Sequence, residues 1–388
     1  MSFLTTIASA FKAGAAPARP PLARSFASPW LFPEAYGLSS PRGTFNYEAA
    51  VRAGYLQNPV AQRAVRLVAE GVGGAPLSAS DPALLALVAA TSAGQSLLET
   101  LAAQLLLQGN GFVQVLKDAR GRPVELFALR PERVTVVPDE AGWPAAFDYR
   151  VGEKAVRIEA LDELGRPNLI HLKGFHPADD HYGAGCLDAA GEAVAVHNAA
   201  SAWNRALLEN GARPSGALVY DGGEPGAVLT PDQFDRLKAE LAAAYAGAAN
   251  AGRPMLLEGG LSWQSLSLTP ADMDFATLKA AAARDIALAF GVPPMLLGLP
   301  GDSTYANYRE ANRALWRLTL LPLAGKILAG IAEGVSAWFG QATLSVDLDR
   351  VPALSEDRER LWAQVTAADF LSAAEKRSLL GLETPDAA

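Results

Sequence analysis

One short stretch of the sequence gathers side chains that could bind a metal ion. His176, Asp179, Asp180 and His181 lie close together, and His171 comes just before them. Imidazole and carboxylate groups are common metal ligands, but this spacing matches no established metal motif. The segment also lies between an expected strand and a glycine-rich turn, where polar residues are ordinary. We therefore expect no metal site here, and we expect His197, on a helix, to be packed or exposed rather than catalytic.

The motifs that bind nucleotides or activate a serine are missing. Gly301-Asp-Ser-Thr is too short for a phosphate-binding loop and has no lysine. Gly260-Leu-Ser-Trp lacks the final glycine of a nucleophile elbow. Gly183-Ala-Gly lacks the third glycine of a dinucleotide fingerprint. These observations predict a chain with no cofactor and no catalytic residues.

Three basic side chains, Arg205, Lys279 and Arg284, lie on two long helices that the sequence predicts. Asp272, Asp274 and Asp285 lie near them in the sequence, so their surroundings are mixed in charge. A solvated helix face is the simplest interpretation of each one. They do not form the basic patch by which proteins hold phosphate tightly.

The composition describes a folded protein that does not depend on electrostatic attraction to nucleic acid. The chain has 388 residues, half of them hydrophobic, and a net charge of −8. Cys186 is its one cysteine, so a disulfide within the chain is impossible and we expect folding in a reducing compartment. We also expect no membrane-spanning helix, because no continuous apolar run is long enough.

The most informative element is a loop held between two helices. Gly291 can end the first helix, and Pro293 and Pro294 prevent its continuation. Gly298, Pro300 and Gly301 then favour irregular backbone. Ser303 or Thr304 can cap the next helix, which we expect to run from about 307 to 339 with a kink at Pro322.

The region before these helices predicts a mixed α/β part. We expect helices over 58–71 and 96–106, and a small mixed sheet of strands over 112–116, 124–129, 134–137, 147–151 and 168–172. Residues 13–45 are rich in Pro, Ala and Ser and read as a flexible arm.

The helices over 187–210 and 270–290 enclose a small insert. We expect strands at 214–220, 253–257 and 261–268, and a helix over 230–248 that Thr230 and Gln233 begin as a capping box. Two adjacent shafts with a small module at their far end would result. After the loop and its long helix we expect a strand over 344–349 and helices over 354–368 and 372–380. The fold class is therefore α+β.

At this point the order of parts resembles the portal proteins of tailed bacteriophages and gene-transfer agents, in their compact long-tailed-phage form. The matching segments are Glu209-Asn-Gly-Ala-Arg-Pro-Ser-Gly-Ala-Leu218, Leu256-Leu-Glu-Gly-Gly-Leu261, Ile286-Ala-Leu-Ala-Phe-Gly-Val-Pro-Pro-Met-Leu-Leu-Gly298, Thr304-Tyr-Ala-Asn307, Thr319-Leu-Leu-Pro322 and Ala374-Glu-Lys-Arg-Ser-Leu-Leu-Gly-Leu382. The Phe-Gly-Val-Pro-Pro and Thr-Tyr-Ala-Asn pair is the most specific. The resemblance covers about residues 55–382.

The resemblance implies a map of the chain. It implies a flexible arm (1–55), a mixed α/β wing (56–184), a first stem helix (185–212), a clip (213–268), a second stem helix (269–292), a tunnel loop (293–306), a kinked channel helix with a wing strand (307–351) and a short helical crown (352–388).

It also implies a function and partners. The family forms a dodecameric ring at one capsid vertex, through which double-stranded DNA is packaged and ejected, in a virion or phage-like particle assembled in the bacterial cytoplasm. Its partners are a terminase ATPase, a head–tail adaptor and the major capsid protein, with no membrane. The resemblance carries the DNA-facing role onto the tunnel loop, Leu299, Pro300, Gly301, Asp302, Ser303 and Thr304. Stem residues that could line the channel are Arg205, Lys279 and Arg284, and clip residues that could meet terminase or adaptor are Arg213, Pro214, Tyr220 and Trp263.

Two other classes stay open on the residues alone. One is another head–tail connector or structural ring component, although short connectors lack the order of stem, clip, stem and loop. The other is an enzyme, such as a hydrolase that uses the His176–His181 segment. That class requires a pocket with converging polar groups.

Overall fold

The computed structural model describes residues 47–92, 94–209, 216–220, 229–245, 261–265, 275–299 and 305–381. Their contacts divide them into two compact units. Unit 1 contains 72–185 and 323–348, and unit 2 contains the described residues of 47–71, 186–322 and 349–381. The strand expected at 253–257 and the helix cap expected at Ser303 or Thr304 lie outside the described residues.

Unit 1 holds most of the strands. Its elements are β1 (Leu77–Ala79), α3 (Pro82–Ala89), β2 (Thr91–Ser92), β3 (Gln95–Ser96), α4 (Leu97–Leu107), β4 (Asn110–Lys117), β5 (Pro123–Leu129), β6 (Val134–Pro138), β7 (Pro144–Val151), β8 (Lys154–Glu159), β9 (Leu169–Lys173), α9 (Leu321–Gly334), α10 (Ser336–Phe339) and β12 (Leu344–Val346).

These strands do not form the single mixed sheet that we expected. They form two separate three-stranded sheets, in the orders β5-β4-β9 and β6-β7-β8, and every pairing in them is antiparallel. The expectation also missed β8 and the short pair of β1 with β12. β8 is an edge strand with almost all its side chains exposed, so its sequence has no apolar alternation to detect.

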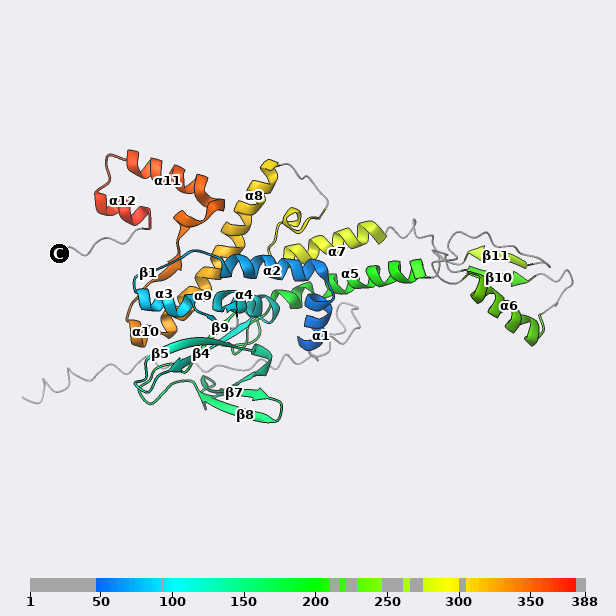
Figure 1. Cartoon of the computed structure of the whole chain (residues 1–388), viewed down its shortest axis with the longest axis horizontal. Coiled ribbons are helices and arrows are strands. Elements are labelled where there is room, and N and C mark those ends of the chain that lie inside the picture. The colour runs from blue at the N-terminus through cyan, green and yellow to red at the C-terminus, as the bar shows by residue number, and fades with distance from the viewer. Residues whose placement is uncertain are drawn as a thin grey trace, which may run out of the picture. The chain divides into compact units, whose positions relative to one another are not determined.

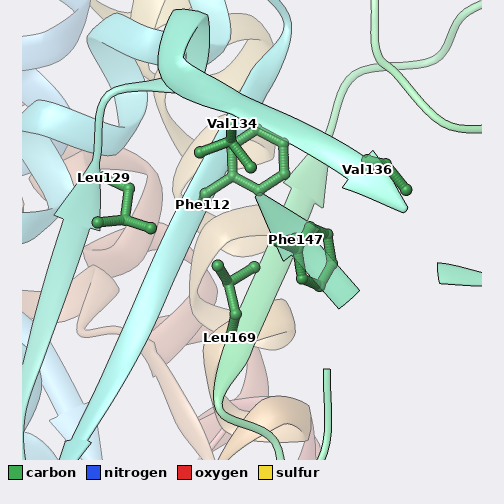
Figure 2. Packing of buried hydrophobic residues seen from close by; sticks show 6 residues of the cluster. All are labelled: Phe112, Leu129, Val134, Val136, Phe147 and Leu169. Carbon is green, nitrogen blue, oxygen red and sulfur yellow. The ribbon is translucent and has the colours of Figure 1, made fainter. Parts of the chain in front are cut away.

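The core of unit 1 lies between the two sheets. Figure 2 shows six of its buried side chains: Phe112, Leu129, Val134, Val136, Phe147 and Leu169. The rings of Phe112 and Phe147 meet edge to face with centroids 5.9 Å apart, a favoured aromatic geometry. Tyr182 places its hydroxyl oxygen 2.9 Å from the backbone nitrogen of Val136 and accepts its hydrogen bond.

Helix starts in unit 1 follow from local side-chain chemistry. Asp81 accepts a hydrogen bond from the backbone of Ala83 at 2.7 Å, and Pro82 occupies the first position of α3. Ser96 caps α4 by accepting from Glu99 at 3.2 Å, at the position that the sequence predicted.

Unit 2 holds most of the long helices. Its elements are α1 (Tyr47–Val51), the π-helical turn η1 (Arg52–Leu56), α2 (Pro59–Gly73), α5 (Cys186–Glu209), β10 (Gly216–Tyr220), α6 (Pro231–Tyr245), β11 (Leu261–Ser265), α7 (Phe275–Ala289), the 3-10 turn η4 (Pro294–Leu297), α8 (Tyr305–Leu315), the π-helical turn η5 (Trp316–Leu320), α11 (Ser355–Ala367) and α12 (Ala373–Leu379).

The helix expected over 307–339 is divided rather than continuous. A π-helical turn, Trp316–Leu320, separates α8 from α9, and a break at Val335 precedes α10. Pro322 has no backbone N–H and would crowd the carbonyl four residues earlier, so a wider turn at this point relieves the clash.

The helices α5, α6, α7, α11 and α12 match the prediction closely, whereas α3 was not expected, and α1 and η1 lie where the last part of a flexible arm over 1–55 was expected. α12 begins with Ser372 and Glu375 in a reciprocal capping box, as the sequence indicated. The expected strand over 344–349 is shorter, because a 3-10 turn, η6 (Leu348–Arg350), replaces its second half.

One described stretch, Asn307–Gly334, is long and apolar enough to cross a membrane on length and composition. The expectation concerned a continuous apolar run, and this stretch is interrupted by charged residues such as Arg317 and Lys326, so it meets the criterion only by its mean hydropathy. Core helices pass the same test, and within unit 1 this stretch buries Ala324, Ile327, Leu328 and Ile331. Gly330 and Gly334 pack directly against Leu172 and Ile170 of β9, which is the contact of a helix on a sheet.

Candidate functional site

Two helices from distant parts of the sequence, α5 and α7, lie side by side in unit 2 (Figure 1). Their buried residues recur every three or four positions, which defines one face of a helix. On α5 these residues are Leu187, Ala190, Val194, His197 and Ala200, and on α7 they are Ala282, Ala283, Ile286 and Ala287. The expected pair of shafts is therefore present.

Asn58 holds the start of α2 against α5. Its side-chain oxygen accepts from the backbone of Val60 at 3.1 Å and of Ala61 at 3.0 Å, which caps α2. Its amide nitrogen donates to the Oδ1 atom of Asn198 at 3.0 Å and lies 3.2 Å from Nδ1 of His197. Asn58 is 1 % exposed, so these bonds replace water completely.

The contact with Asn58 determines the state of His197. An amide nitrogen can only donate, so Nδ1 of His197 must accept and the imidazole must be neutral with its proton on Nε2. Burial lowers the pKa of His197, and the nearby charge of Lys279 lowers it further. His197 is thus a structural residue at the base of the helix pair, as its helical position suggested.

The C-terminus of α7 ends in a Schellman motif. Gly291 has a φ of +64° and donates to Leu288 at 3.0 Å, while Val292 donates to Ala287 at 2.9 Å. Val292 is buried, which supplies the apolar contact that accompanies this cap. The predicted role of Gly291 as the residue just after the helix is confirmed.

Thr319 ties this turn to the π-helical segment η5. Its hydroxyl donates to the carbonyl of Gly291 at 2.6 Å. A Cβ on Gly291 would lie 2.8 Å from that hydroxyl oxygen, so the approach also requires glycine. The π-helical turn therefore positions the start of the loop.

The loop is partly helical rather than irregular throughout. Pro294–Leu297 forms the 3-10 turn η4, and Gly298 ends it with a φ of +74°. Leu299 is half-buried, and the other predicted tip residues, Pro300, Gly301, Asp302, Ser303 and Thr304, lie outside the described residues.

A groove opens beside this turn. Its volume is about 240 Å³, and its lining is apolar except for Arg284. Leu288 of α7 and Leu318 of η5 form two of its walls, and each keeps 78 % of its surface exposed. Pro294 at the start of η4 contributes a third wall.

Ion pairs join α8 to α11. Arg313 lies 2.7 Å from Glu356 and 3.5 Å from Asp357, and Arg309 lies 2.7 Å from the other carboxylate oxygen of Glu356. The Arg313 side chain is 15 % exposed, so solvent screens it less than its neighbour. The C-terminal helices are thereby attached to the helix that follows the loop.

The three basic residues that the sequence singled out differ in position. Arg205 and Arg284 are exposed, whereas Lys279 is half-buried on the face of α7 that meets α5. Whether any of them contacts DNA stays a prediction.

The predicted clip residues are only partly described. β10 and β11 pair antiparallel, which places Tyr220 opposite Leu261 and Trp263 opposite Leu218. Arg213 and Pro214 lie outside the described residues.

The histidines near residue 176 are held by local contacts. His171 stacks on Phe112 with centroids 4.1 Å apart and lies 3.1 Å from Oδ1 of Asn110, so its Nε2 donates. Asp179 accepts from the backbone of His181 and Tyr182. Among the described residues no group of three or more His, Cys, Asp or Glu side chains is arranged to hold a metal.

Sequence reasoning missed three residues that organise this site. Asn58 had a visible signal, because Asn followed by Pro is a common helix start, but its bonds to α5 depend on the tertiary structure. Thr319 begins the segment Thr319-Leu-Leu-Pro322 that resembles the family, but nothing in the sequence points to its bond with Gly291, and Arg313 had no signal, since an arginine within a helical pattern is ordinary.

A family model described as "Phage portal protein" matches residues 59–381. A protein of Rickettsia bellii is 40% identical over 347 residues, covering 84% of this chain and 87% of the relative.

Two solved structures are similar over nearly the whole chain. A protein in the virion of a native gene transfer agent particle is 49% identical, with a TM-score of 0.67, over 88% of this chain and 95% of that one. A chain in the neck of a native gene transfer agent particle, computed with C12 symmetry, is 49% identical with a TM-score of 0.66, over 87% of this chain and 94% of that one. The family model covers most of the chain, and the helix pair, the Schellman turn and the following loop lie in the expected order. This chain belongs to the phage portal protein family.

Proposed function

We propose that the chain is the subunit of a twelve-fold portal ring at a unique vertex of a phage-like particle, where it forms the channel for DNA packaging and ejection. The observation that carries this proposal is the C12-symmetric neck that contains a chain 49% identical to this one over 87% of its length. Identity at that level over most of the chain supports the same assembly.

Within that ring we propose the division of the chain that the resemblance implied. Residues 56–184 form the wing, α5 and α7 form the stem, 213–268 form the clip, and 352–388 form the crown. The clip would meet the terminase ATPase and later a head–tail adaptor, while the wing would face the major capsid protein.

The role in DNA passage falls on the tip of the tunnel loop, residues 299–304. The ordered elements on both sides support this. The Schellman turn at Gly291, η4 and the bond from Thr319 hold the first part of the loop, residues 291–299, in a defined backbone geometry. A net charge of −8 per subunit supports passage of DNA without strong retention, because phosphate affinity depends on Lys and Arg contacts.

In this proposal the chain has a structural role in the ring. The terminase ATPase performs the work of DNA packaging.

Two measurements test the proposal. Mass photometry and electron microscopy of the purified protein should show closed rings with a central hole, and a strict monomer at micromolar concentration in several salts would refute it. Replacing residues 299–304 by a short glycine linker should then lower the amount of packaged DNA while rings still form. If that replacement abolishes rings, the tip serves assembly and not DNA passage.

A further inference from the structure

The apolar groove between α7, η4 and η5 leaves two large leucine side chains uncovered. Leu288 and Leu318 each keep 78 % of their surface exposed, and Pro294 continues the apolar lining between them. Arg284, also in the lining, already donates to the carbonyl of Ala280 at 3.5 Å. The groove therefore suits an apolar occupant, because covering the two leucines removes apolar surface from water without any need for an ion pair.

The chain itself supplies a segment of matching chemistry. Residues 1–46, which we call the N-terminal arm, lie outside the described residues, and Trp30-Leu-Phe32 within them is a run of large apolar side chains with a proline on each side. A proline disfavours helix at the residue before it, so this sequence favours an extended backbone and loses less conformational freedom on binding. In an extended backbone, side chains two positions apart point to the same side, so Trp30 and Phe32 would enter one groove together.

The described chain begins in the same unit as the groove. α1 and η1 pack on α5, where Gly54 closely approaches the side chain of Leu187. From there α2 leads to η5, because Gly71 packs directly against Leu320 of the turn that also provides a wall of the groove. All of these residues belong to unit 2. The N-terminal arm, which joins the described chain at Tyr47, is therefore attached to the elements that form the groove.

The connecting segment is long enough to reach η5. From Tyr47 to Gly71 the chain is helical except for a break at residues 57–58, so these two residues are at most about 40 Å apart. The segment from Phe32 to Tyr47 spans about 50 Å when it is extended. The apolar run thus reaches the turn on which Gly71 packs, in its own subunit.

We propose that Trp30-Leu-Phe32 of the N-terminal arm docks in the groove of its own subunit, against Leu288, Pro294 and Leu318. The docked segment covers the two exposed leucines and supports η4, where the loop begins. The arm is then a strap that sets the mobility of the loop base, since its release uncovers one side of η4. This inference needs only one subunit, so it stands or falls independently of the proposed ring.

Cutting by chymotrypsin tests the docking in the full chain. The protease cuts after Trp30 when the segment is free, and Phe11 is a reference site in the same arm outside the proposed contact. In the wild type, cutting after Trp30 should be at least tenfold slower than cutting after Phe11. Leu318→Glu should remove this difference, because covering a carboxylate with apolar side chains is costly. Leu379→Glu, at an exposed leucine of α12, is the matched control and should keep it.

Two outcomes of this experiment would overturn the docking. One is equal cutting at both sites in the wild type. The other is slow cutting after Trp30 that persists in Leu318→Glu.

A photo-cross-linker identifies the occupant of the groove. With p-benzoylphenylalanine in place of Phe32, irradiation should link position 32 to residues 288–294 or 314–318. In a mixture of isotopically light and heavy subunits, these links should join peptides of the same chain. Links to the groove that form only between different chains would make a second copy the occupant, and links only to other surfaces would exclude the groove. Either result would overturn the proposal.

Hydrogen exchange tests the effect on the loop base. When Trp30→Ser and Phe32→Ser are combined, the amides of residues 295–299 should exchange severalfold faster than in the wild type. The matched control combines Phe3→Ser with Phe11→Ser in the same arm and should leave this exchange unchanged. Unchanged exchange in the first variant would show that the arm does not hold the loop base.

Discussion

Thr319 donates its hydroxyl to the carbonyl of Gly291 at 2.6 Å, and so joins the π-helical turn before Pro322 to the end of α7. The π-helical turn η5, which accommodates Pro322, thus also provides the Thr319 hydroxyl that holds the start of the loop. The loop direction depends on a contact between residues far apart in sequence.

Gly291→Ala should destabilise the protein more than Gly298→Ala. Both positions have positive φ, which costs a residue with a Cβ about 1–2 kcal/mol. At Gly291 the added carbon would also lie 2.8 Å from the Thr319 hydroxyl, whereas at Gly298 it meets no atom within 4 Å. Urea unfolding midpoints measure the difference. Equal shifts for the two variants would show that the Thr319 side chain moves away from the added carbon with no loss of stability.

Thr319→Val should weaken the attachment of the loop, while Thr319→Ser should not. Valine keeps the shape but removes the donor, for a loss of about 1 kcal/mol. Hydrogen exchange of the amides of 290–299 should rise in the valine variant. Exchange that is unchanged there, or equally raised in the serine variant, would contradict a positioning role for the hydroxyl.

Asn58→Ala should be among the most destabilising single changes in unit 2. It removes the cap of α2, worth about 1 kcal/mol, and leaves the buried Nδ1 of His197 and the part-buried Oδ1 of Asn198 without this partner, for about 1–3 kcal/mol more. Asp81→Ala is the matched control, because it removes an exposed cap alone. Denaturant unfolding should separate the two, and equal losses would mean that water replaces the bonds to α5.

Acid should destabilise the protein through His171 and His197. Burial lowers the pKa of His171 to about 3, and that of His197 also falls. Between the lowered pKa and the ordinary value near 6.5, the unfolded chain binds a proton that the folded chain refuses, so stability is lost as the pH falls.

The measurement is the free energy of unfolding between pH 6.5 and pH 5, where few carboxylates titrate. His171→Gln, which stays neutral, should make the pH dependence shallower by up to about 1 kcal/mol per pH unit, less than the full value because the ring keeps some exposed surface. An unchanged slope in His171→Gln would contradict the lowered pKa.

Arg313→Ala should loosen α11 and α12. Arg313 contacts Glu310, Glu356 and Asp357, so its loss removes most of the charge contact between α8 and α11. Hydrogen exchange in residues 355–379 should become severalfold faster, and high salt should produce part of the same effect in the wild type. Arg309→Ala, at the more exposed partner, should have a smaller effect; the reverse order would show that burial does not strengthen the Arg313 pairs.

Several features of this protein follow from local sequence. The ends of α7, α12 and α4 are encoded by Gly291, by Ser372 with Glu375, and by Ser96, because caps use side chains and backbone within a few residues. The family follows from sequence as well, since its motifs are continuous segments.

The tertiary structure alone decided how distant parts meet. β8 escaped detection because an exposed edge strand has no apolar period, and the two sheets appeared as one because pairing partners are chosen by packing, not by propensity. The bonds of Asn58 to α5, of Thr319 to Gly291, and of Arg313 to α11 join residues that no local pattern connects. Such contacts exist only once the chain has folded, because each needs a donor and an acceptor brought together from separate elements.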